Sequence, residues 1–118
     1  MAGERRELDA LARLAGATGV ILTGRDGMLI EATMERQRAE ALSALVASSY
    51  GAASELGGDM PALADPEEVI IEADKGALYV IPAGPSRLLV LLSGPGGNLG
   101  VIRLEMRQAA TRLATGGQ

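Results

Sequence analysis

The sequence predicts an α+β fold in which an antiparallel sheet is covered by helices on both faces. The segment Arg87–Ser93 holds five consecutive apolar residues between two turns that contain glycine and proline. This run is too short for an ordinary helix and does not alternate with polar residues, so it predicts a strand buried on both faces. Three other segments have apolar residues at helical spacing and supply the covering layers. Short turns between the remaining strand segments favour antiparallel pairing.

Composition excludes several classes of protein. The chain, residues 1–118, is expected to form one domain, and 47% of its residues are hydrophobic. Cysteine and histidine are absent, which excludes disulfides, thiolate nucleophiles, imidazole bases and Cys/His metal sites. No apolar run reaches the roughly 20 residues of a membrane span, and the charged N-terminus lacks a signal-peptide pattern, so we expect a cytoplasmic protein. A net charge of −4 and only two aromatic residues argue against nucleic-acid binding.

The chain begins with a predicted helix and a predicted hairpin. Glu4–Ala15 has leucines at helical spacing and is followed by Gly16, a typical C-terminal cap. Val20–Thr23 and Met28–Ala32 are short apolar segments. They flank Asp26-Gly27, a dipeptide favoured in tight hairpin turns.

A long second helix is expected after Thr33, its predicted cap, and it should run to about Leu56 and stop at Gly57-Gly58. One stripe at helical spacing comprises Leu42, Leu45, Val46, Ser49, Ala53 and Leu56. A second stripe consists of small residues, namely Ala41, Ala44, Ser48, Gly51 and Ala52. No charged residue occurs between Ala41 and Ser54, whereas a surface helix of a monomer carries a charged outer face. The helix therefore lies inside a single fold or meets a partner, and the small size of the chain favours a partner.

A three-stranded antiparallel meander is predicted next. Gly57–Pro66 is either a plain connection or a mobile contact loop. Glu67–Ala73 and Ala77–Ile81 are strand segments joined by a turn at residues 74–76, and Gly84-Pro85 turns the chain into the central strand.

Gly94–Gly100 joins this strand to the last predicted helix, which is capped by Asn98 and runs from Leu99 to about Leu113. Its arginines, Arg103 and Arg107, are expected on a solvated face. Phosphate loops occur in such a strand-to-helix context, but the glycine spacing and the missing lysine do not match those motifs. A tight turn is therefore expected here, and no cofactor is expected.

No arrangement of residues predicts catalysis. Glu68 and Glu72 lie roughly 13 Å apart by strand rise, which is too far for a tight acid–base pair. Lys75 and Tyr79 are near enough in the sequence to meet, but no nucleophile with a base accompanies them. We therefore expect a protein that is not an enzyme and that has no metal site.

The order helix, hairpin, long helix, three-stranded meander, helix resembles the Roadblock/dynein light chain family, with its MglB-like prokaryotic regulators of small GTPases. The supporting segments are Gly19–Gly27, a strand that runs into an Asp-Gly turn, and Leu88–Ser93 followed by Asn98–Arg103. The resemblance covers about Leu8 to Leu113. It implies a five-stranded antiparallel sheet with helices on both faces, in the order α-β-β-α-β-β-β-α, with the last strand in the middle. It also implies homodimers or heterodimers.

The resemblance implies a dimeric regulator that binds a Ras-like small GTPase and modulates its nucleotide cycle, as a GTPase activator or a related regulator. The alternative is a scaffold dimer that docks other proteins without changing nucleotide turnover, and a small-ligand sensor is the weaker third class. If a GTPase partner exists, none of Arg25, Arg36 and Arg38 is expected to act as an arginine finger. The expected dimer or partner interface comprises Ala41, Ala44, Ser48, Gly51, Ala52, Glu68, Ile70 and Glu72.

The segment Glu67–Ala73 is expected to be an edge strand, because its turn pairs it on one side only. The resemblance places this strand at the dimer axis, where two copies pair antiparallel. Ile70 shares a strand face with Glu68 and Glu72 and is expected to pack against the long helix or its copy in the partner. The alternative is a solvated edge with one stray isoleucine.

Overall fold

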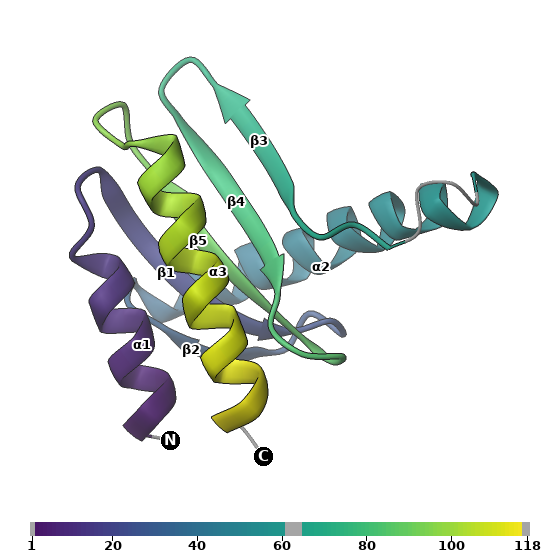
Figure 1. Ribbon diagram of the computed structural model, residues 1–118, viewed down its shortest axis with the longest axis horizontal. Helices are drawn as coiled ribbons and strands as arrows, with labels where there is room; N and C mark the ends of the chain where they lie inside the picture. Colours follow the sequence, from purple (N-terminus) through teal and green to yellow (C-terminus); the bar gives the residue numbers. More distant parts are fainter. Residues whose placement is uncertain (1, 61–64, 117–118) are drawn as a thin grey trace.

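The computed structural model describes residues 2–60 and 65–116. Within these residues the elements follow the predicted order (Figure 1). The helices are α1 (Ala2–Ala12), α2 (Arg36–Asp59) and α3 (Leu99–Gly116). The strands are β1 (Ala17–Gly24), β2 (Leu29–Ala32), β3 (Val69–Ala73), β4 (Gly76–Pro82) and β5 (Arg87–Ser93).

The strands form one antiparallel sheet in the order β2-β1-β5-β4-β3. The strand that comes last in the sequence therefore lies in the middle, and the predicted five-stranded sheet is confirmed. β2 and β3 are its two edge strands.

Helices cover both faces of this sheet, as predicted (Figure 1). The side chains of Leu89 and Leu91 on β5 pack in one cluster with residues of α1 and α3, including Leu8 and Met106. The alternate side chains of β5 pack with residues of α2 in a second cluster. Four consecutive residues of β5, Leu88 to Leu91, are fully buried, and burial of each contributes about 1.5–3 kcal/mol. The absence of alternation in the sequence of β5 thus reflects two cores, one on each face.

The long second helix differs from its prediction at both ends. Glu35 is its N-cap, and the Glu35 carboxylate accepts hydrogen bonds from the backbone N–H groups of Gln37 and Arg38 at 2.9 and 3.0 Å. The predicted cap, Thr33, is instead used by the sheet, because its Oγ1 accepts a hydrogen bond from the N–H of Val20 at 3.0 Å. The predicted stop at Gly57 is also wrong, since the helix continues to Asp59 and Gly57 is a buried position on it. Residues 61–64 of the predicted 57–66 loop lie outside the described residues.

Other boundaries shift for local reasons. α1 ends at Ala12 rather than Ala15, because Arg13 and Leu14 donate hydrogen bonds to the carbonyls three residues earlier and tighten the last turn. Gly16, the predicted cap of α1, lies beyond the helix in a turn with a φ of 88°. The edge strand β3 begins at Val69, two residues after the predicted start.

The glycine-rich connection between β5 and α3 is a tight turn that packs against the α1–β1 turn. The N–H of Gly94 donates a hydrogen bond to the carbonyl of Gly16 at 2.8 Å. A Cβ atom on Gly16 would lie 2.4 Å from the backbone nitrogen of Gly97, so glycine is required by the close approach of two backbones. The predicted cap of α3 is confirmed, since Asn98 Oδ1 accepts a hydrogen bond from the N–H of Val101 at 3.0 Å.

Candidate functional site

The outer face of α2 is exposed and is not covered by another element of the described chain. The buried residues of α2 recur at helical spacing and are Ala39, Ser43, Val46, Tyr50 and Gly57. All five small residues of the predicted interface stripe, Ala41, Ala44, Ser48, Gly51 and Ala52, are exposed. The outer face of α2 therefore does not lie inside the fold of a single chain.

Large apolar side chains lie on this same exposed face. Leu45 is 65% exposed, Leu56 59% and Met60 55%. The first stripe identified in the sequence therefore mixes two environments, with Val46 buried and Leu45, Ser49 and Leu56 exposed. From Ala41 to Ser54 the helix carries no charged residue on any side, so the spacing of its apolar residues does not by itself identify the buried face.

The edge strand β3 lies beside this helix face. In Figure 1 the last turns of α2 extend past β3, beyond the edge of the sheet. Val69 packs with the cluster under α2, and strand alternation puts Ile71 on the same face of the sheet. Ile71 is 50% exposed. We use the name α2–β3 surface for the exposed uncharged residues of α2 and for Ile71 of β3, namely Ala41, Ala44, Leu45, Ser48, Gly51, Ala52, Leu56 and Ile71.

The backbone of β3 has a defined open side. The N–H of Ala83 donates to the carbonyl of Arg87 at 2.9 Å, so alternate residues of β4, including Tyr79, bond toward β5. The intervening residues of β4, Leu78 and Val80, bond toward β3. There Leu78 pairs with Ile71, and Val80 pairs with Val69. It follows that the N–H and C=O groups of Ile70 point away from β4, toward the open edge.

The side chain of Ile70 packs on the opposite face from the one predicted. It lies against the cluster under α1 and α3, not against α2. Ile70 was expected near the long helix, but alternation along the strand does not show which of its two faces that helix covers. Ile70 thus presents its backbone to the edge while its side chain belongs to the core on the α3 side.

Glu68, just before β3, binds two arginines of α3. Its carboxylate accepts hydrogen bonds from Arg103 Nε at 2.6 Å and Nη2 at 2.9 Å, and it also pairs with Arg107. These hydrogen bonds, first that from Arg103, lower the pKa of Glu68. The two arginines were expected on a solvated face, and the opposite charges on α3 and beside β3 are the signal in the sequence that could have identified this contact. Glu72 is exposed and is not brought near Glu68.

Arg25 is held against α2 and does not project freely from the β1–β2 turn. Its guanidinium lies 4.9 Å from the centre of the Tyr50 ring, a cation–π arrangement. The hydroxyl of Tyr50 donates a hydrogen bond to the carbonyl of Pro66 at 2.7 Å. Burial raises the pKa of Tyr50. Arg36 and Arg38, the other two candidate arginines, are exposed in the first turn of α2.

Lys75 and Tyr79, which the sequence allowed to meet, do not form a catalytic site. Tyr79 is buried under α1 and α3, whereas Lys75 is exposed in the β3–β4 turn. In residues 2–60 and 65–116 no three Asp or Glu side chains are grouped so as to hold a metal ion. No helix in that part of the chain is long and apolar enough to cross a membrane.

Comparison with known proteins identifies the relatives of this chain. A protein of Methanocaldococcus jannaschii with no characterised function is 31% identical over 109 residues, which are 92% of this chain and 91% of the relative. A second protein of the same organism is 29% identical over 109 residues, 92% of this chain and 94% of the relative.

Solved structures share the fold over nearly the whole chain. A structure of MglB in a tetrameric arrangement has a TM-score of 0.86 and 26% identity, covering 100% of this chain and 94% of the other. The gliding protein MglB of Thermus thermophilus has a TM-score of 0.87 and 25% identity, covering 97% of this chain and 87% of the other. The Roadblock/LC7 domain family matches residues 6–93. The chain therefore belongs to the Roadblock/LC7 domain family.

Proposed function

We propose that this protein is a cytoplasmic homodimer that binds a Ras-like small GTPase and modulates its nucleotide cycle. The observation that carries the proposal is the exposed outer face of α2, which carries no charged residue from Ala41 to Ser54, together with the open edge of β3. An apolar surface of this kind on a small chain is typical of a protein–protein interface. Family membership and the similarity to MglB structures support a small GTPase as the class of partner.

In the proposed homodimer the α2–β3 surface meets its own copy across a two-fold axis. The small side chains of Ala44, Ser48 and Gly51 permit two α2 helices to approach closely. The outward backbone groups at Ile70 are free to pair with a second β3 strand and extend the sheet. Sedimentation equilibrium of the wild-type protein should therefore give the mass of a dimer, and a clean monomer at micromolar concentration would contradict this part of the proposal.

Regulation is proposed to act through positioning of the GTPase. An inserted arginine finger contributes about 10³-fold or more to the rate of GTP hydrolysis. Arg25 is engaged with Tyr50, while Arg36 and Arg38 are exposed at the start of α2. We expect that replacing each arginine by alanine changes stimulated turnover by far less than this factor. A thousandfold loss from any single replacement would assign that arginine as a finger.

The proposal is tested by nucleotide-dependent capture followed by a rate measurement. The tagged protein is used to capture proteins from its source lysate loaded with a GTP analogue or with GDP, and captured GTPases are identified by mass spectrometry. The purified GTPase is then assayed for single-turnover hydrolysis and for nucleotide release, with and without this protein. We expect capture that depends on the nucleotide and a change in one of the two rates.

A variant with a charge on the proposed interface provides the control. Ser48→Glu should lose both capture and the rate effect if the α2–β3 surface is needed. Capture that is indifferent to nucleotide, with both rates unchanged, would contradict the proposed regulator and favour a scaffold dimer.

A further inference from the structure

The second edge of the sheet, at β2, differs from the edge at β3. Thr33 lies just after β2, and its N–H donates to the carbonyl of Val20 at 2.9 Å, so the backbone of Thr33 faces β1. Alternation along the strand then directs the N–H and C=O groups of Ala32 away from the sheet. In an ordinary edge strand these outward groups are the template for another strand.

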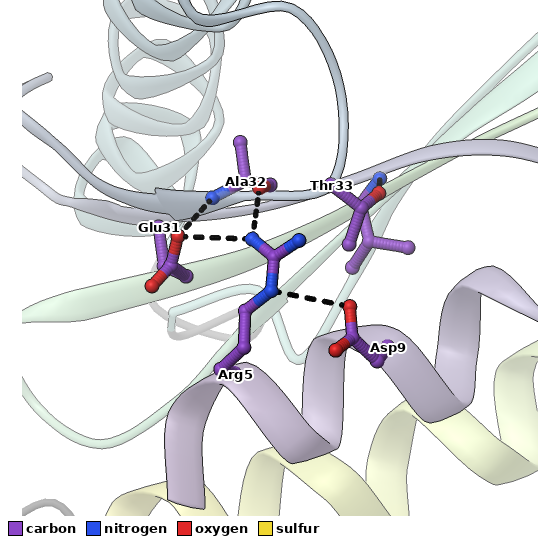
Figure 2. A network of polar contacts seen from close by, with 6 residues as sticks. Arg5, Asp9, Glu31, Ala32 and Thr33 are labelled. Atoms are coloured by element: carbon purple, nitrogen blue, oxygen red, sulfur yellow. Dashed lines mark hydrogen bonds and ion pairs between the residues drawn. The ribbon is translucent and has the colours of Figure 1, made fainter. Parts of the chain in front are cut away.

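Side chains already occupy both outward groups of Ala32 (Figure 2). Arg5, on α1, donates a hydrogen bond from Nη1 to the carbonyl of Ala32 at 2.7 Å. Glu31 Oε1 accepts a hydrogen bond from the N–H of Ala32 at 3.3 Å. The same Glu31 oxygen lies 3.2 Å from Arg5 Nη1, and Asp9 Oδ1 lies 3.3 Å from Arg5 Nε. We call Arg5, Asp9 and Glu31 the β2 clasp.

The rest of β2 is irregular. Glu31 pairs with Leu22 and Leu29 with Thr23, so Ile30 is an extra residue that bulges from the ladder. Ile30 is 40% exposed, and the neighbouring Met28 is 69% exposed. These apolar side chains would favour association if the edge were open, because they would be buried by an added strand.

We propose that the β2 clasp closes this edge to strand addition by a second copy of the chain. The sheet then extends only through β3, and assembly through sheet edges stops at two copies. This last step rests on the proposed homodimer, whereas closure of β2 does not. With both edges open, two different pairing interfaces on each chain would generate open-ended assemblies instead of a closed dimer.

The test compares Arg5→Ala with Arg6→Ala, its matched control. Both replacements remove one positive charge from α1, and both residues are exposed, but Arg6 is not part of the clasp. Mass is measured by light scattering over a range of concentrations. We expect Arg5→Ala to at least double the mass relative to wild type, and Arg6→Ala to leave the mass unchanged.

A cysteine in place of Ile30 reports which edge associates. The natural chain has no cysteine, so any disulfide formed on oxidation comes from the reporter. Ile30→Cys should give a covalent dimer in the Arg5→Ala background and none with the clasp intact. If circular dichroism shows Arg5→Ala to be unfolded, Glu31→Ala, which frees the N–H of Ala32, takes its place.

An unchanged mass in a folded clasp variant, or a larger mass without cross-linking through the introduced cysteine, overturns the proposal. A wild-type monomer in the same measurement would instead refute the homodimer. Closure of the β2 edge would still be tested by the difference in mass between wild type and the clasp variant. Failure of the homodimer and failure of the clasp therefore give different results.

Discussion

Glu68 connects the start of the edge strand to α3 through Arg103 and Arg107. The Glu68 side chain is 13% exposed, while the two arginine side chains are 40% and 53% exposed. The contact is thus a mostly buried carboxylate held by two partly solvated cations. Removing the carboxylate leaves the arginines able to turn to water, so the loss should be moderate.

We predict that Glu68→Ala lowers the free energy of unfolding by about 1.5–3 kcal/mol, the range for hydrogen bonds to charged groups. The neighbouring exposed Glu67 provides the control, because Glu67→Ala should change that free energy by less than about 0.5 kcal/mol. Urea unfolding at neutral pH measures both. Equal values for the two variants would show that the Glu68 contact does not stabilise the fold.

The pKa of Glu68 also predicts a pH dependence. Hydrogen bonds from the arginines lower the pKa of Glu68 below its usual value of 4.5 in the folded state. Its contribution to stability should therefore be complete above 4.5 and decline as the pH falls through the lower, folded-state pKa. The difference in unfolding free energy between wild type and Glu68→Ala should shrink in this acidic range. A difference that is constant with pH would contradict the prediction.

The helix α2 presents an outer face that no other element of the described chain covers. The buried residues of α2 are Ala39, Ser43, Val46, Tyr50 and Gly57. From Ala41 to Ser54 its outer face carries small residues and the exposed Leu45, and no charged residue. Such a surface is costly to keep in water, which is the physical reason for expecting a partner.

We predict that Ala44→Glu or Ser48→Glu dissociates the proposed homodimer. An unpaired charge buried at a contact costs about 3 kcal/mol or more, which corresponds to at least about a hundredfold increase in the dimer Kd. Sedimentation equilibrium measures this Kd. Gln108→Glu adds the same charge at an exposed position of α3 and should leave the Kd unchanged. Dimers of wild-type affinity in both α2 variants would exclude this face as the contact.

The edge strand β3 gives a second prediction, because adjacent residues bond in opposite directions. Ile70→Pro removes an N–H that points to the open edge, so the variant should fold but become a monomer. Ile71→Pro removes an N–H that bonds to β4, so it should destabilise the fold. Thermal unfolding and light scattering of both variants separate these effects. A stable dimer in both cases would show that β3 is not the contact.

At the scale of the whole molecule, backbone N–H groups at the turn between β5 and α3 already have hydrogen-bond partners within the protein. This glycine turn packs on the α1–β1 turn, where the N–H of Gly94 already bonds to Gly16. Asn98 occupies the N–H of Val101 at the start of α3, and the turn lacks the lysine that reaches phosphates.

We therefore predict that the protein alone neither binds nor hydrolyses nucleotide. Isothermal titration calorimetry with GTP and with ATP should give no heat of binding, with the captured GTPase as the positive control. A dissociation constant in the micromolar range for either nucleotide would contradict this prediction.

Local chemistry was sufficient to predict the elements and most of the sheet. Three features depend only on residues next to one another in the sequence, so the sequence reveals them. They are the apolar run of β5, the Asp-Gly hairpin turn and the Asn98 cap. The same applies to the stretch of α2 from Ala41 to Ser54, whose lack of charged residues can be read directly from the sequence. The resemblance added the order of the strands.

Only the tertiary structure decided how those elements face one another. The sequence allows Thr33 either to cap a helix or to bond to a strand. In the structure its hydroxyl accepts a hydrogen bond from Val20 of β1, and Glu35 caps α2 instead. Ile70 packs under α3 because its side chain lies on the face of the sheet that α1 and α3 cover. Arg25 packs on Tyr50 because the β1–β2 turn lies against α2.

The sequence by itself determined local periodicity, turns and charge. Contacts between residues far apart depend on packing geometry that no local pattern contains. The β2 clasp is of this second kind, because its Arg5 and Glu31 are 26 positions apart and meet only once α1 has packed beside the edge of the sheet.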